Sequence, residues 1–62
     1  MKRFVTDYAN YRISCFLEDQ KRTGTDHTDE IRRIDRIHFS VNAGLLSIDD
    51  GMRELANVGN DR

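Results

Sequence analysis

The sequence has no proline, no tryptophan and one cysteine among its 62 residues. Because Cys15 has no second cysteine to pair with, no disulfide can form within the chain, and a small domain without disulfides is typical of a reducing compartment. No apolar run is long enough for a membrane span or for the hydrophobic part of a secretion signal. We therefore expect a cytoplasmic protein with no membrane contact.

The chain also lacks a strong excess of either charge. Ten lysines and arginines against eleven aspartates and glutamates give a formal net charge of −1, so no overall field attracts the chain to nucleic acid or to anionic lipid. Hydrophobic residues reach only 37%, and a chain this short buries about 60% of the surface that its unfolded form exposes. We expect one small domain over residues 1–62, whose small core needs additional stability from hydrogen bonding and dispersion or from a partner.

Apolar residues recur at intervals of three and four in three segments, about 3–22, 28–43 and 47–58, and this spacing predicts helices. The expected stripes are Phe4, Val5, Tyr8, Ala9, Ile13, Phe16 and Leu17, then Ile31, Ile34, Ile37, His38, Val41 and Leu45, and finally Ile48, Met52, Leu55 and Val58. The sequence predicts an all-α fold, a small three-helix bundle. The alternative is a helical hairpin that dimerises, with the short third helix across its end.

Capping residues indicate where the first helix ends and the second begins. Gly24 follows two basic residues and is expected to stop the first helix. Thr28 precedes two acidic residues and is the preferred N-cap of the second helix, with Thr25 or Asp26 as alternatives.

The second turn carries equally local signals. Gly44 predicts a left-handed helix end with an apolar residue just beyond it. Ser47 precedes two acidic residues and is expected to cap the third helix. Residues 59–62 are expected to fray.

The spacing of the reactive side chains argues against catalysis and metal binding. Cys15, His27 and His38 form none of the paired-ligand patterns of zinc sites, and the scattered glycines form no phosphate-binding loop. His38 lies on the isoleucine stripe, where a partly buried and hydrogen-bonded side chain is expected. We therefore expect no enzyme, with no catalytic, cofactor-binding or metal-binding residues and no cofactor.

One candidate interaction surface lies on the second helix. Arg32, Arg33 and Arg36 are expected to point away from the isoleucine stripe, and Phe39 lies beside Arg32 and Arg36. An aromatic ring next to guanidinium groups is typical of protein interfaces, and the same arginines suit phosphate binding with Lys2 and Arg3 as an arm. The alternative is that Phe39 packs under a neighbouring helix and the arginines pair with carboxylates.

A second candidate surface lies on the first helix, where Tyr8, Tyr11 and Cys15 follow Phe4. The apolar arc of this helix is wider than one neighbouring helix covers. Tyrosine buries a large ring while its hydroxyl stays wet, so this face suits a contact with another subunit or protein. The alternative is that these residues belong to the core.

The stretch from Gly44 to Leu55 resembles the turn and helix start of many unrelated bacterial helical modules, including short oligomerisation hairpins. The whole chain is similar to small open reading frames of bacteria, their phages and mobile elements. This resemblance implies a bacterial, phage or mobile-element source and carries no functional residues across.

These observations favour a small cytosolic helical module that self-associates or binds a larger protein. The alternative function is a weak nucleic-acid-binding accessory protein that uses Arg32, Arg33 and Arg36. Nucleic acid is the less favoured partner because acidic residues share the second helix.

Overall fold

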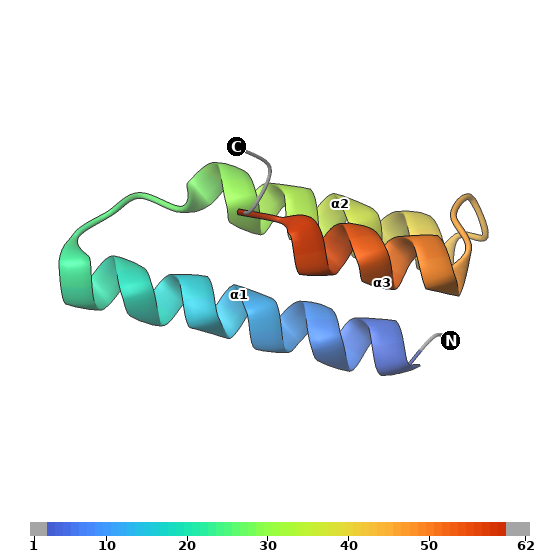
Figure 1. Ribbon diagram of the computed structural model, residues 1–62, viewed down its shortest axis with the longest axis horizontal. Helices are drawn as coiled ribbons and strands as arrows, with labels where there is room; N and C mark the ends of the chain where they lie inside the picture. Colours follow the sequence, from blue (N-terminus) through green and yellow to red (C-terminus); the bar gives the residue numbers. More distant parts are fainter. Residues whose placement is uncertain (1–2, 60–62) are drawn as a thin grey trace.

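A computed structural model describes residues 3–59, which form an all-α three-helix bundle. The helices are α1 (Arg3–Thr23), α2 (Thr28–Asn42) and α3 (Ile48–Asn57), and each contacts the other two. Helix α2 runs antiparallel to both α1 and α3 (Figure 1). The bundle prediction is confirmed, because α3 packs along the α1–α2 hairpin rather than across its end. The predicted arm residue Lys2 and residues 60–62 of the predicted frayed tail lie outside the described residues.

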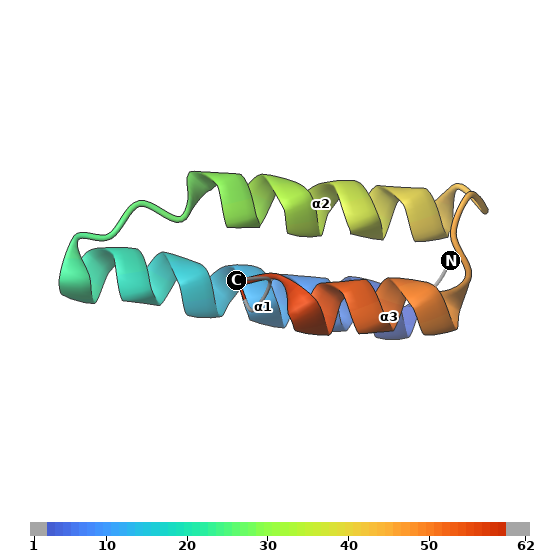
Figure 2. The same cartoon turned by 45° about the horizontal axis from the view of Figure 1, so that its top comes forward.

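Helix α1 is the longest element, with 21 residues against 15 in α2 and 10 in α3. Its last turns extend past the beginning of α2 and the end of α3, while its first turn lies at the same end of the bundle as the α2–α3 connection (Figures 1 and 2). A large part of the α1 surface is therefore left without a neighbouring helix.

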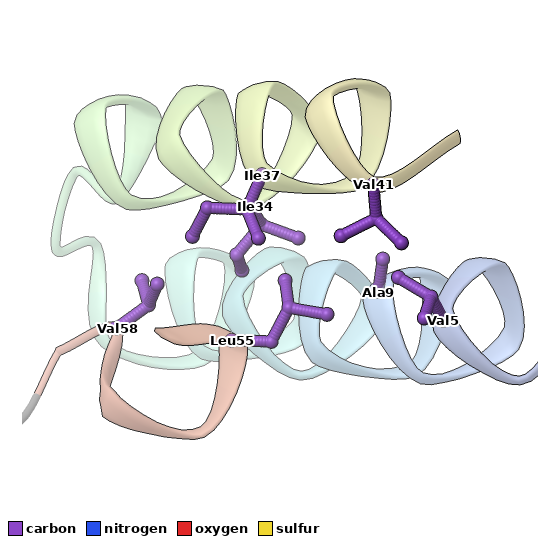
Figure 3. Close-up of a cluster of buried hydrophobic side chains, with 7 residues drawn as sticks. All are labelled: Val5, Ala9, Ile34, Ile37, Val41, Leu55 and Val58. Atoms are coloured by element: carbon purple, nitrogen blue, oxygen red, sulfur yellow. The ribbon is translucent and has the colours of Figure 1, made fainter. Parts of the chain in front are cut away.

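The core among the described residues consists of seven buried side chains contributed by all three helices and the residue after α3. Figure 3 shows them pointing toward one another between the helices: Val5, Ala9, Ile34, Ile37, Val41, Leu55 and Val58. Tyr8, Ile13, Phe16, Leu46 and Met52 pack against this cluster with part of their surface exposed. The isoleucine stripe of α2 is thus the centre of the core, as its periodicity predicts.

Several apolar residues on the expected stripes are exposed, so that part of the prediction is wrong. Phe4 is 83% exposed, Leu17 47%, Leu45 81% and Ile48 43%. Leu45 follows the left-handed turn at Gly44 and so leaves the face of α2. Phe4, Leu17 and Ile48 lie toward helix ends, where a neighbouring helix gives them only partial cover.

The α2–α3 connection follows its sequence signals. Gly44 has φ +79°, and its N–H donates to the Val41 carbonyl, while the Leu45 N–H donates to the Ser40 carbonyl. These two bonds form a Schellman motif that satisfies the last carbonyls of α2. Ser47 then accepts a hydrogen bond from the Asp50 N–H at 3.2 Å, which confirms it as the cap of α3.

The start of α2 differs from the preferred prediction. His27 occupies the N-cap position and makes no side-chain capping bond, and Thr28 is the first helical residue. Instead, Asp26 Oδ1 accepts a hydrogen bond from the Thr28 N–H at 3.0 Å and another from the Thr28 hydroxyl. The hydroxyl bond is the largest cause that lowers the pKa of Asp26 below 3.8, and the backbone bond is the next. The carboxylate one position before the cap therefore supplies the anionic group that favours a helix N-terminus.

Arg12 joins the end of α3 to α1. Its guanidinium donates to the Val58 carbonyl and lies 5.3 Å from the centre of the Phe16 ring. The hydrogen bond satisfies the carbonyl just after the last turn of α3. Together with the contact to the Phe16 ring, it holds α1 against the end of α3.

Gly51 determines how closely α3 approaches α2. It is buried, and a Cβ atom built on it lies 2.3 Å from Val41 Cγ2. Valine is stiff about χ1, so its methyl group cannot turn away without cost. The glycine thus permits the close contact that covers Val41.

We predict that Gly51→Ala destabilises the fold by about 1–3 kcal/mol, although alanine is the better helix former by about 1 kcal/mol. The added methyl group has to displace Val41 or push α3 away. Urea unfolding followed by circular dichroism measures the change.

A double-mutant cycle with Val41→Ala is the control. Removing the opposing methyl groups should relieve part of the Gly51→Ala cost, so the two substitutions should be non-additive by about 1 kcal/mol or more. A stabilising Gly51→Ala, or full additivity with Val41→Ala, would contradict the close contact.

Candidate interaction surfaces

The first candidate surface is a row of side chains on α1, which we call the α1 seam: Phe4, Tyr8, Tyr11 and Cys15. Phe4 and Tyr11 are 83% and 62% exposed, Cys15 is exposed, and Tyr8 is half-buried against the core. The alternative that this face belongs to the core is therefore wrong for all but Tyr8.

The two tyrosines of the α1 seam are ordered by each other. Their rings stack with centroids 6.4 Å apart and planes 18° apart. A side-chain hydrogen bond with Cys15 is the main reason that the pKa of Tyr11 is raised above 10.0. Tyr11 thus presents a ring that already stacks on Tyr8, so little entropy is lost when a partner buries it.

The second candidate surface lies on the outer side of α2, and we call it the α2 face: Arg32, Arg36 and Phe39. Phe39 is 68% exposed and its ring centre lies 5.8 Å from that of His38, so it does not pack under another helix. Arg32 and Arg36 are exposed and form no ion pair with the carboxylates of residues 3–59. Together with Asp29 and Arg33 they line a shallow groove.

His38 lies between the α2 face and α1. Its Nε2 and Thr6 Oγ1 are hydrogen bonded at 2.9 Å, and the same hydroxyl accepts a weaker bond from Asn42 Nδ2 at 3.4 Å. This confirms that His38 is partly buried and hydrogen bonded. It also places the Phe39 ring at the edge of the α1–α2 contact.

One end of the bundle carries an additional apolar surface that the sequence did not indicate. Phe4 lies in the first turn of α1, Phe39 in the last turn of α2, Leu45 in the connection and Ile48 at the start of α3. These segments lie at the same end of the bundle (Figure 1). Four of the six large exposed hydrophobic residues among the described ones therefore gather at this end, at the boundary of both candidate surfaces.

A polar cluster at the other end of the bundle is also unforeseen by the sequence patterns. The His27 side chain is only 14% exposed, its Nε2 donates to Asp19 Oδ2 at 2.6 Å, and its ring lies 4.8 Å from that of Phe16. Gln20 Oε1 accepts from the His27 N–H at 2.6 Å. These contacts fasten the α1–α2 connection to the last turns of α1.

The pairing of His27 with Asp19 shifts the pKa of both side chains. The Asp19 hydrogen bond is the largest cause that raises the pKa of His27 above 6.5, and Glu30, 3.6 Å from His27 Nδ1, adds to it. The same bond, followed by that from Arg22, lowers the pKa of Asp19 below 3.8. We assign this cluster a structural role, because it connects the two helices and leaves His27 largely buried.

Residues 3–59 contain no group of three or more histidine, cysteine, aspartate or glutamate side chains placed to hold a metal ion. Within the same part of the chain, no helix combines the length and the apolar character that crossing a membrane requires.

Comparison of the chain with models of protein families, with curated proteins and with solved structures gave no match.

We predict that the interaction between His27 and Asp19 depends on pH. Because the folded pKa of His27 is raised, its contribution is complete below about pH 6.5 and is lost as pH rises through the folded value. Because the folded pKa of Asp19 is lowered, its contribution is complete above about pH 4 and is lost as pH falls through the folded value. The pair should stabilise the fold most between these limits.

A double-mutant cycle of His27→Gln and Asp19→Asn, followed by urea unfolding, measures this coupling. The coupling free energy should be larger at about pH 5.5 than at about pH 8.5. The same cycle with Arg22→Gln in place of His27→Gln is the control, since arginine does not titrate in this range. Equal coupling of His27 and Asp19 at both pH values would count against a protonated histidine.

Proposed function

We propose that this chain is a protein–protein interaction module that works through the α1 seam and the α2 face. The single observation that carries the proposal is the exposure of large side chains on these surfaces: Phe4, Tyr11 and Phe39 are each more than 60% exposed, while the core among residues 3–59 has seven buried hydrophobic residues. Contact of such side chains with water is unfavourable, and a partner that covers them lowers the free energy.

The chemistry of both surfaces supports the proposal. Tyrosine, phenylalanine and arginine are enriched where proteins bind one another, and their truncation is costly at hot spots. On the α2 face, Arg32 and Arg36 lie on successive turns with Phe39 one turn further. Their guanidinium groups are available to a partner carboxylate because no carboxylate among residues 3–59 engages them.

The proposal also covers the cellular location of the protein and its mode of action. We propose a bacterial, phage or mobile-element protein of the cytoplasm that binds a second copy or a larger protein and has no catalytic activity. The free, exposed Cys15 supports a reducing compartment.

A weak nucleic-acid-binding function is the second candidate. The groove lined by Arg32, Arg33 and Arg36 favours it, since arginine side chains suit contacts with phosphate groups. Asp29 lines the same groove, and the net charge of −1 opposes the approach of a polyanion. We therefore rank this function below protein binding.

We predict that Phe39→Ser abolishes partner binding and leaves the fold intact. The ring is 68% exposed, so its loss should change the free energy of unfolding by less than about 0.5 kcal/mol. A hot-spot loss of about 2 kcal/mol or more lowers affinity about thirtyfold. The measurement is capture from a host lysate by the immobilised full chain, quantified by mass spectrometry for wild type and variant in parallel.

Leu17→Ser is the matched control, because Leu17 is an exposed hydrophobic residue outside both surfaces. Proteins retained by wild type and by Leu17→Ser, but lost with Phe39→Ser, support the proposal. Equal retention by all three chains, or unfolding of Phe39→Ser, contradicts the role of Phe39.

Fluorescence titration with duplex DNA at low salt separates the second candidate. Binding that weakens in an Arg32→Ala, Arg36→Ala variant supports nucleic-acid recognition, with a salt dependence that falls as the two contacts are lost. No binding, or equal binding by the wild type and this variant, rules out nucleic-acid recognition by these arginines.

A further inference from the structure

The α1 seam continues beyond its four defining residues in a regular repeat. Phe4, Tyr8, Tyr11, Cys15, Glu18 and Arg22 follow one another at intervals of four, three, four, three and four residues. This is the spacing of the contact positions in a two-helix coiled coil. The continuation is as open as the seam, since Glu18 is exposed and the Arg22 side chain is 79% exposed.

The order of residues along this repeat distinguishes two ways of pairing it with itself. In a parallel pair, Glu18 would face Glu18 and Arg22 would face Arg22, and like charges in contact oppose association. In an antiparallel pair, Phe4 faces Arg22, Tyr8 faces Glu18 and Tyr11 faces Cys15. Each end of the repeat then meets its chemical complement.

These antiparallel contacts are favourable ones. A guanidinium group over a phenylalanine face is a cation–π contact, and Arg22 keeps that face available while one of its N–H groups donates to Asp19 at 3.0 Å. A tyrosine hydroxyl donates to a glutamate carboxylate in a charge-assisted bond. The uncharged Tyr11 and Cys15 occupy the centre, where the pair is driest.

The shape of the bundle leaves room for such a pairing. The last turns of α1, which carry Glu18 and Arg22, extend past α2 and α3, so a second α1 can lie along them (Figure 1). Helix α1 is about 30 Å long at 1.5 Å per residue. An antiparallel partner therefore contacts it over its whole length.

We propose that a second copy of this chain occupies the α1 seam, with the two α1 helices antiparallel about a two-fold axis between Tyr11 and Cys15. The inference rests on the proposed function and names the partner for one of its two surfaces. A two-fold axis makes each contact occur twice, so a modest set of side chains gives a closed dimer. The α2 face stays outward in this dimer and is free for a different protein.

Cysteine cross-linking between two single-cysteine chains tests the arrangement. One full-length chain carries Phe4→Cys with Cys15→Ser, and the other carries Arg22→Cys with Cys15→Ser. Both substituted positions are about 80% exposed in the described structure, so each chain should fold, which circular dichroism verifies. The chains are mixed, oxidised mildly, and separated by mass.

The expected result is a mixed disulfide between the two different chains, at least about tenfold above the disulfides that join identical chains, because pairing raises the local concentration of the two thiols into the millimolar range. In an antiparallel pair, the two copies of position 4 are about 27 Å apart along the axis. The control replaces Arg22→Cys with Leu17→Cys, which lies off the repeat and should give no excess. Excess disulfides between identical chains, or a mixed product no greater than the control, overturn the proposal.

Sedimentation separates this failure from failure of the proposed function. The wild-type chain should shift from 7.2 kDa toward twice that mass as its concentration rises, and Tyr11→Glu should stay at the lower mass. A monomer at all concentrations overturns the dimer, while capture that still depends on Phe39 leaves the interaction function standing.

Discussion

Burial of the isoleucine stripe of α2 is the interaction on which the rest of the structure depends. Ile34, Ile37 and Val41 are covered by α1 on one side and by α3 on the other. The second contact is close at Val41 because Gly51 has no side chain to hold Val41 away. Among residues 3–59, seven buried side chains and the residues packed against them form this core, so each helix has one face that is stabilised from within the chain.

The small size of this core also explains why large apolar side chains are exposed. Helix α1 is twice the length of α3 and has more apolar side chains than a small core can use. Phe4 and Tyr11 consequently face solvent on α1, and Phe39 does so on α2. In a larger domain another layer would cover them, and we propose that a second chain does so here. The exposed aromatic rings are thus a consequence of the small size of the core.

Sequence reasoning succeeded where the cause is local. Periodicity places α2, and Gly44 and Ser47 act through hydrogen bonds within a few residues of themselves. It failed where burial depends on which helix lies opposite, as for Leu45, or where a contact joins residues across a turn, as for His27 and Asp19. The role of Gly51 was similarly hidden, because its effect comes from Val41 on another helix.

The sequence pattern located both candidate surfaces on α1 and α2, and the exposure of their side chains was found only in the structure. The central claim is that association between chains adds to the stability that this core provides. Its most direct test is the urea midpoint of the full chain over a hundredfold range of concentration, about 1 to 100 μM. The account predicts a midpoint that rises with concentration in the wild type and stays constant in Tyr11→Glu. A wild-type midpoint independent of concentration would contradict it.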